Sequence, residues 1–137
     1  MAYWLLKSDP DSYPWTRMAA DGRTAWDGVR NHQAANNLKA MRKGDRAFFY
    51  HSQADKAVVG IVEIVREYHP DPSDSSGRFG MVEVKAVGPL RAPVTLAQVK
   101  AEPRLKDLAL VRHTRLSVTP IDAPSWTLIC RWGGAPG

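Results

Sequence analysis

Short runs of apolar residues, separated by polar and glycine-containing breaks, follow one another along most of the chain. The run over 46–52 is apolar on both faces and predicts a central strand, and 57–68 is the longest run. Gly60 lies inside that run, so a bulge or a close backbone approach is expected there. Alternation over 81–87 indicates a half-exposed antiparallel strand that ends at Gly88-Pro89. The predicted strands are 1–7, 24–26, 46–52, 57–68, 81–87 and 115–120.

Two-residue alternation divides the longest strand into two apolar faces. We expect one face to carry Val58, Gly60, Val62 and Ile64, and the other to carry Val59, Ile61 and Val65. A long strand that is apolar on both faces near its start usually curls, which favours a barrel over a flat sheet.

Apolar residues at spacings of three and four predict a helix over His32–Lys43. Asn31 is its expected N-cap and Gly44 its expected C′ residue. A terminal helix should begin after Asp122 and stop at Gly133-Gly134. Shorter helical pieces are expected within 9–21, 95–100 and 105–112, a hairpin loop at 53–56 and a mobile loop at 69–80.

About six strands, mostly linked by hairpins, indicate an α+β domain built on a small, curved, mixed β-barrel flanked by short helices. The 137 residues and 44% apolar content suit one domain over 1–137. No apolar run is long enough to span a bilayer and no secretory signal is recognised, so we expect no membrane contact. The expected compartment is the cytoplasm, or the nucleus in a eukaryote.

The formal charge of +5 is concentrated in one segment. Between Leu90 and Arg115 there are six basic residues against two acidic ones. Such a region attracts a polyphosphate backbone, which favours nucleic acid as a partner. The alternative is a basic surface that serves only solubility.

Motifs for enzymes and for cofactor or metal binding are missing from the sequence. The single cysteine, Cys130, lies beside Ile129 on the apolar face of the terminal helix, where a packing role is expected. The four histidines lack metal-ligand spacing, so neither a metal nor a cofactor is expected. His51-Ser52 is the best acid/base candidate, although adjacent strand residues point to opposite faces.

The stretch from Trp26 to Asn31 offers the best candidate binding site. Trp26 supplies a flat apolar wall, and Asp27-Gly28 allows a sharp turn. Backbone N–H groups over 29–31, held at a helix start, suit a phosphate or a base carbonyl. A slot of this kind suits a flat heterocycle such as a nucleobase. The alternative is a core tryptophan followed by a capped helix, and the same choice applies to Tyr50.

Several strings of residues resemble the EVE domain family, which belongs to the PUA-like superfamily together with YTH and ASCH domains. They occur in the family's order and extend almost from the first residue to the terminal helix. The strings are Tyr3 to Asp11 (YWLLKSDPD), Trp26 to Ala34 (WDGVRNHQA) with 36–38, Gly44-Asp45 leading to Phe48 to Ser52 (FFYHS), 59–61, 93–96, 110–112 and 115–118.

The resemblance implies a PUA-like barrel and a pocket for a modified base flipped out of DNA or RNA, with C5-modified cytosine the leading candidate. Trp26 would be the stacking wall, and His32 departs from the tyrosine that the family often has. The implied protein is a reader, not an enzyme, and is expected to be a monomer. The expected binding residues are Lys7, Ser8, Trp26, Asp27, Val29, Arg30, Asn31, Tyr50, His51, Ser52, Arg115, Leu116 and Ser117.

Two alternatives stay open at this point. An ASCH-like enzyme acting on RNA or on a modified nucleotide would use His51, Lys7 and Tyr50 as acid/base groups. A protein interaction module would hold a peptide in the same slot.

Overall fold

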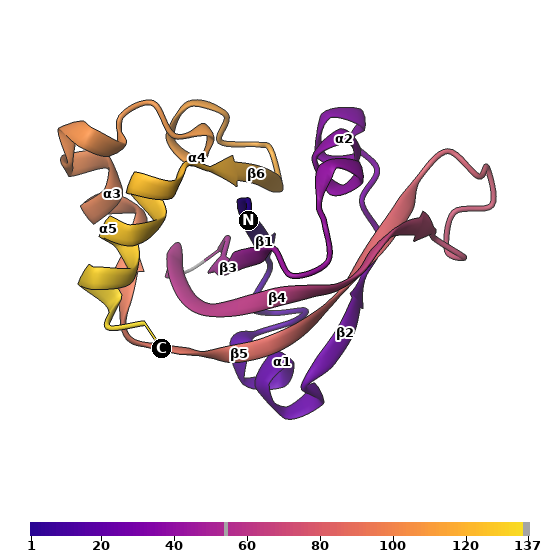
Figure 1. Cartoon of the computed structure of the whole chain (residues 1–137), viewed down its shortest axis with the longest axis horizontal. Helices are drawn as coiled ribbons and strands as arrows, with labels where there is room; N and C mark the ends of the chain where they lie inside the picture. The colour runs from indigo at the N-terminus through magenta and orange to yellow at the C-terminus, as the bar shows by residue number, and fades with distance from the viewer. Residues whose placement is uncertain (54, 136–137) are drawn as a thin grey trace.

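One mixed sheet of six strands organises the computed structural model, which describes residues 1–53 and 55–135 (Figure 1). Ala54, in the predicted hairpin loop, and the last two residues of the predicted domain lie outside the described residues. The strands are β1 (Tyr3–Ser8), β2 (Arg23–Trp26), β3 (Arg46–His51), β4 (Ala57–Pro70), β5 (Gly80–Thr95) and β6 (Val118–Ile121). The helices are α1 (Trp15–Asp21), α2 (His32–Ala40), α3 (Leu96–Ala101), α4 (Ala109–Arg112) and α5 (Ala123–Gly133), with a 3-10 turn, η1 (Pro103–Leu105).

The strand order is β2-β5-β4-β3-β1-β6. Strands β1 and β3 are parallel, with Tyr3 opposite Arg46 and Ser8 opposite His51, and the other neighbours are antiparallel. The sheet bends strongly along β4 and β5 (Figure 1). Within the described residues the edge strands β2 and β6 do not pair, so the sheet is curved but not closed. The predicted α+β class with six strands is confirmed.

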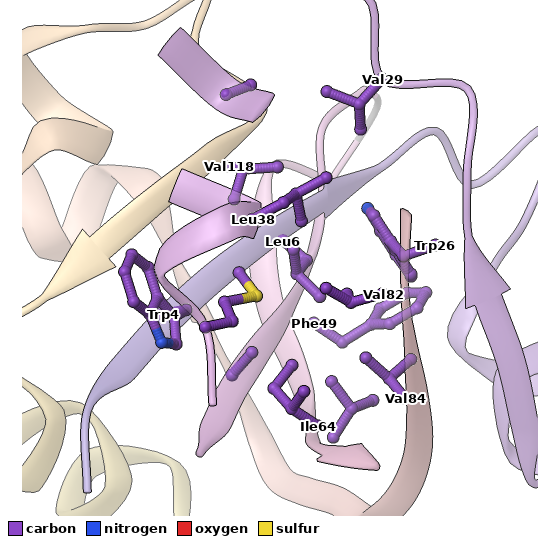
Figure 2. Packing of buried hydrophobic residues seen from close by; sticks show 14 of the residues in the cluster. Trp4, Leu6, Trp26, Val29, Leu38, Phe49, Ile64, Val82, Val84 and Val118 are labelled. Atoms are coloured by element: carbon purple, nitrogen blue, oxygen red, sulfur yellow. The ribbon is translucent and has the colours of Figure 1, made fainter. Parts of the chain in front are cut away.

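Two apolar cores lie on the two sides of the bent sheet. One packs α1 and α2 against the sheet around Leu6, Phe49 and Val82 (Figure 2). The other packs the C-terminal helices against it around Leu5, Phe48 and Trp126, and the rings of Phe48 and Trp126 stack at 3.9 Å. Because successive strand residues point to opposite faces, each central strand contributes to both cores. None of the helices among residues 1–53 and 55–135 combines the length and apolar character needed to cross a bilayer.

Bulges in β4 make the predicted faces of that strand wrong. The register with β5 shifts between Val58 and Gly60 and again between Ile61 and Val62. Val58 and Ile61 therefore face the second core, whereas Val62 faces the first core. Each extra residue in a bulge moves the following side chains to the other face. The expected close approach at Gly60 is confirmed, because a Cβ there would lie 2.6 Å from the ring of Trp15.

Strand β5 continues past Gly88-Pro89, where the sequence predicted its end. Gly88 and Pro89 lie opposite Ile61 and Gly60, next to the irregular register of β4. A proline lacks the N–H that a regular ladder needs, and an irregular pairing tolerates this loss. The strand therefore reaches Thr95, whose side chain accepts a hydrogen bond from Gln98 N and caps α3.

Helix α2 begins as predicted and ends earlier than predicted. Asn31 Oδ1 accepts a hydrogen bond from Ala34 N at 2.9 Å, so the N-cap is confirmed. The helix ends at Ala40 because the carboxylate of buried Asp45 accepts a hydrogen bond from Arg42 N at 3.0 Å. That bond replaces a helical one, and Gly44 N instead donates to Ile64 O. The prediction that Gly44 is the C′ residue was therefore wrong.

Candidate functional site

The ends of β1 and β3 bring several predicted site residues together. The two strands are parallel, so Lys7 lies opposite Tyr50 and Ser8 opposite His51. Backbone bonds extend this alignment on both sides of β1: Ser52 N donates to Ser8 O, and Lys7 N donates to Ser117 O, both at 2.9 Å. Parallel strands end at the same edge of a sheet, so this edge gathers polar groups from distant parts of the chain.

Alternation of side chains divides these residues between two cavities. Ser8 lies on the side of the first core, whereas Lys7 and Tyr50 lie toward the second. The sequence prediction placed them in a single pocket. The first cavity, called here the Trp26 cavity, measures about 300 Å³. It is lined by Lys7, Ser8, Asp9, Tyr13, Thr24, Ala25, Trp26 and Asp27.

Trp26 is both a core residue and a cavity wall. Its side chain is 9% exposed, and its ring meets Phe49 edge to face at 5.7 Å between centroids. Trp26 pairs with Val82 of β5, and Figure 2 shows the indole beside Val82 and Phe49. The ring also borders the Trp26 cavity. The two interpretations left open by the sequence therefore both describe this residue.

The polar groups around the Trp26 cavity differ in how they are bonded. Ser8 Oγ donates to Tyr13 O at 2.7 Å, and Tyr13 OH donates to Asp21 Oδ2 at 2.7 Å. Burial, with help from Asp21, raises the pKa of Tyr13, so its hydroxyl stays protonated. The carboxylate of Asp27 is exposed and has no hydrogen bond or ion pair with any described residue. The cavity therefore offers an apolar wall and a carboxylate that can accept hydrogen bonds.

The sequence did not single out Asp9, Tyr13, Thr24 and Ala25 as lining residues. Thr24 could have been predicted from the sequence, because it lies two residues before Trp26 on a predicted strand and hence on the same face. Tyr13 reaches the cavity through a turn in which Ser12 N and Tyr13 N both donate to Asp9 O. Such a turn, centred on Pro10-Asp11, has no periodicity from which its direction could be predicted.

Asp71 holds the stretch after Trp26 against the loop between β4 and β5. Its buried carboxylate accepts hydrogen bonds from Gly28 N at 2.9 Å and from Arg30 Nη1 at 3.3 Å. Ser73 N and Oγ donate to its other oxygen. Burial alone would raise the pKa of Asp71, but these hydrogen bonds outweigh it and hold the pKa far below its usual value. Asp71 thus forms several hydrogen bonds within the loop over 69–80, which the sequence predicted to be mobile, and to the stretch after Trp26.

This arrangement turns three predicted site residues away from the Trp26 cavity. Arg30 lies over the ring of Phe79, 5.8 Å from its centroid, and donates to Ser73. The side chain of Val29 is buried in the first core. Asn31 caps α2 and lines a separate hollow of about 300 Å³ with Gln33, His113, Thr114, Arg115 and Leu116.

Both nitrogens of His51 are used within the fold. Trp15 N donates to His51 Nε2 at 3.0 Å, so the ring proton lies on Nδ1, which donates to Asp55 Oδ2 at 2.9 Å. The side chain therefore links the start of α1 to the turn after β3. A general acid or base needs a nitrogen that can reach a substrate proton. This geometry leaves His51 no such nitrogen.

A second cavity, called here the basic cavity, measures about 390 Å³. It is lined by Lys7, Tyr50, Ser52, Gln53, Lys56, Leu96, Lys100, Leu110, Thr114, Arg115 and Ser117. Lys7 Nζ donates to Thr114 O at 2.9 Å, and burial lowers the pKa of this amine. Tyr50 is 3% exposed, and burial, with a smaller contribution from Asp55, raises its pKa to about 12.

The segment 115–117 borders the basic cavity and the hollow beside Asn31 as a connection, not as a strand. Strand β6 begins at Val118, so the predicted start at Arg115 was wrong. Leu116 N donates to His113 O and closes a turn, while Ser117 O accepts from Lys7 N. The first of these bonds is local to a turn, whereas the second holds Ser117 beside β1, so the segment leads into β6 without being part of it.

Neither a reactive thiol nor a metal cluster is found among residues 1–53 and 55–135. Burial raises the pKa of Cys130 to about 11, which keeps the sulfur protonated and weakly nucleophilic. Groups of three or more histidine, cysteine, aspartate or glutamate side chains in metal-binding geometry are absent from this part of the chain.

Comparison of sequences identifies relatives over almost the whole chain. The model of the EVE domain matches residues 2–132. Thymocyte nuclear protein 1 of Homo sapiens is 32% identical over 154 residues, covering 88% of this chain and 68% of that protein. The protein of the same name from Gallus gallus is 34% identical, covering 87% of this chain and 63% of that protein. The chain thus spans about two thirds of the length of these relatives.

Comparison of structures agrees with the sequence matches. A protein of Rhodopseudomonas palustris solved by NMR has a TM-score of 0.93 at 55% identity, covering 98% of this chain and 94% of that chain. The crystal structure of human THYN1 protein in complex with 5-methylcytosine containing DNA has a TM-score of 0.90 at 29% identity, covering 100% of both chains. The YTH domain of Zygosaccharomyces rouxii MRB1, in complex with N6-methyladenosine RNA, shares the fold, with a TM-score of 0.60 at 15% identity and coverage of 96% and 85%.

Proposed function

The chain belongs to the EVE domain family, and from this premise we propose that it binds nucleic acid and reads a modified base. The ligand proposed first is DNA that contains 5-methylcytosine, which is what the human THYN1 structure holds. The observation that carries the proposal is the indole of Trp26 at the wall of a cavity of about 300 Å³. Ligand pockets range from roughly 300 to 1,000 Å³, so this one suits a single small ring.

In this proposal the base leaves the helix and enters the Trp26 cavity. Extrusion costs a few kcal/mol, and stacking on an aromatic side chain returns roughly 1–3 kcal/mol per base. The Asp27 carboxylate lies at the same cavity and can accept a hydrogen bond from the N4 amino group of cytosine. Thymine has a carbonyl oxygen at that position, which a carboxylate repels. Trp26 thus supplies stacking affinity and an apolar contact for the C5 methyl group, and Asp27 supplies selectivity between cytosine and thymine.

The other predicted site residues take different roles. Lys7 borders the Trp26 cavity and the basic cavity, so it lies beside the path of the strand that carries the base. Arg30, Val29 and Asn31 position the turn after Trp26 through the contacts described above. We propose a single copy of the chain as the working form.

Reading is favoured over catalysis by the bonding of the acid/base candidates. His51 uses both ring nitrogens within the fold. Tyr50 has a raised pKa of about 12, and Lys7 donates to Thr114 O. The named relatives are a nuclear protein and a DNA complex of the same family. These observations support a binding protein.

The stacking role of Trp26 is tested by the substitution Trp26→Leu, which keeps an apolar side chain in the core. We expect affinity for an oligonucleotide with one 5-methylcytosine to fall about tenfold or more, because stacking is lost. Affinity for the same oligonucleotide with plain cytosine should change much less. Fluorescence anisotropy at two salt concentrations measures both, and a melting curve verifies folding. Unchanged discrimination in a folded Trp26→Leu variant would place the base elsewhere.

The selectivity role of Asp27 is tested with the matched pair Asp27→Ala and Asp11→Ala. Each change removes one exposed negative charge near the N-terminal turn, so the general attraction of DNA rises equally. Only Asp27→Ala should reduce the preference for 5-methylcytosine over thymine at the same unpaired position, by about tenfold. Both bases carry the C5 methyl group, so the comparison isolates the hydrogen-bonding edge, where the bases differ in the group at C4 and in the hydrogen on N3. Equal preferences in the two variants contradict the role of Asp27.

A further inference from the structure

The lysines and arginines of this chain divide into two groups. Nine of them form ion pairs with carboxylates, so their charge is largely neutralised within the fold. These nine are Arg17, Arg23, Arg30, Arg42, Arg46, Arg66, Lys85, Arg104 and Arg112. The basic cavity contains none of the nine. Even Arg104 and Arg112, which lie in the basic segment of the sequence, are paired with Glu102 and Asp107.

The cations of the basic cavity come from four separate parts of the fold. Lys7 lies near the end of β1, Lys56 precedes β4, Lys100 lies in α3 and Arg115 follows α4. Within residues 1–53 and 55–135, the side chains of Lys56, Lys100 and Arg115 form no ion pair or hydrogen bond, and Lys7 bonds a carbonyl oxygen. Like charges brought together repel one another unless an anion neutralises them.

The backbone fixes where these side chains start. Leu96 N donates to Lys56 O at 2.8 Å, which ties the start of β4 to the start of α3. Thr95 and Gln98 form a capping box that sets the direction of α3 and hence the position of Lys100. Lys7 N donates to Ser117 O, which holds the segment after Arg115 against β1. The fold therefore brings the backbone positions of these cations together around one cavity.

Neutral groups of the cavity complete a set of hydrogen-bond donors. The hydroxyl of Tyr50 stays protonated because burial raises its pKa. Asp55 is the acidic residue that acts on Tyr50, and its carboxylate already accepts from His51 Nδ1 at 2.9 Å. Ser52 and Ser117 add two hydroxyl groups to the lining. Ammonium, guanidinium and hydroxyl donors around one cavity match the oxygens of a phosphate group.

We propose that the basic cavity binds a phosphate group of the nucleic acid, in the nucleotide next to the one whose base enters the Trp26 cavity. This proposal rests on the function proposed above. Lys7 borders both cavities, so one strand can pass from the Trp26 cavity to the basic cavity along its side chain. The cavity then sets the register of the strand, and the Trp26 cavity reads one base.

The test uses two cavity variants, each with a control of the same chemistry. Lys100→Gln is compared with Lys106→Gln, because Lys106 is an exposed lysine of the same segment outside the cavity. Arg115→Gln is compared with Arg112→Gln, because Arg112 is paired with Asp107. We expect each cavity variant to weaken binding of a 5-methylcytosine oligonucleotide about tenfold at low salt. The slope of log K against log salt should fall by about one.

The controls should change affinity less than about twofold, since Lys106 lies outside the cavity and Arg112 is already paired with Asp107. The ratio of affinities for methylated and plain cytosine should stay the same in all four variants, because phosphates carry no sequence information. Cavity variants that behave like their controls overturn the phosphate site while leaving base reading intact. A second outcome is that the wild-type protein binds methylated and plain cytosine equally, while the cavity variants still bind more weakly than their controls. That outcome supports the phosphate site and contradicts the proposed function.

A second arm distinguishes a nucleic-acid chain from a free nucleotide as the source of the phosphate. The wild-type protein is titrated with 5-methyl-2′-deoxycytidine 5′-monophosphate and with a trinucleotide that carries the same base in its centre. The trinucleotide should bind more tightly, and Lys100→Gln should remove this advantage. Equal affinity for the mononucleotide and the trinucleotide overturns the assignment to a neighbouring nucleotide.

Discussion

At the scale of single residues, the candidate site depends on side chains that pack within the fold and also line a cavity. Trp26 packs on Phe49 and also borders a cavity. Asp71 touches neither cavity, yet it bonds Gly28 and Arg30 and so fixes the turn after Trp26. The sequence identified Trp26 and Asp27 through their residue types. It gave no reason to connect Asp71 with residues more than forty positions earlier, because a single carboxylate in a polar loop has no periodicity.

The substitution Asp71→Asn tests how strongly this carboxylate holds the turn. It preserves shape but removes the charge, so the hydrogen bonds from Arg30, Gly28 and Ser73 weaken. We expect a loss of about 2 kcal/mol in the free energy of unfolding, in the range for hydrogen bonds to a charged group. Urea unfolding measures the loss. Asp107→Asn, at an exposed ion pair, is the control and should change stability by less than about 0.5 kcal/mol.

The same pair of proteins gives a prediction for pH. The pKa of Asp71 is lowered in the folded protein, so its contribution is complete above the unfolded value of about 4 and is lost as pH falls below it. The stability difference between wild type and Asp71→Asn should therefore be constant from pH 7 to 5 and shrink below pH 4. A difference that persists unchanged to pH 2.5 contradicts the role of the ionised carboxylate.

At the scale of elements, periodicity predicted the existence of the strands better than their faces and ends. The strands at β1, β2, β3 and β4 were predicted within two residues. Two errors, in the faces of β4 and the end of β5, arise at the same bulged pairing of Gly60 with Pro89. A third, at the end of α2, arises from the hydrogen bond between Arg42 N and Asp45. Both causes are contacts between distant or folded-back residues, which local patterns do not contain.

The substitution Gly60→Ala tests the close approach at that bulge. An added methyl group would lie 2.6 Å from the ring of Trp15. The backbone N of Trp15 donates a hydrogen bond to His51, which helps to hold Trp15 in place. We expect a loss of about 1–3 kcal/mol in the free energy of unfolding from overpacking. In a Trp15→Leu background the same methyl group should cost less, because the ring is gone. Equal costs in the two backgrounds, measured by urea unfolding, contradict the contact.

At the scale of the whole molecule, one bent sheet separates two cores and places one cavity on each side of β1. The α+β class and the family resemblance were evident from the sequence. The division of the predicted site residues between two cavities was not evident from the sequence. The prediction grouped these residues by their position at strand ends and ignored the direction of each side chain. Applying alternation to Lys7-Ser8, as was done for His51-Ser52, would have indicated that the two side chains diverge.

The opposite directions of neighbouring side chains at the end of β1 have an evolutionary consequence. With the roles proposed above, mutations on one side of this strand would alter which modified base is preferred, and mutations on the other would alter how tightly any nucleic-acid strand is bound. Since the two sides share little besides the amine of Lys7, each trait can drift or be engineered without disturbing the other. A laboratory that seeks variants for other marks can therefore randomise the positions around the indole and leave the gripping side untouched.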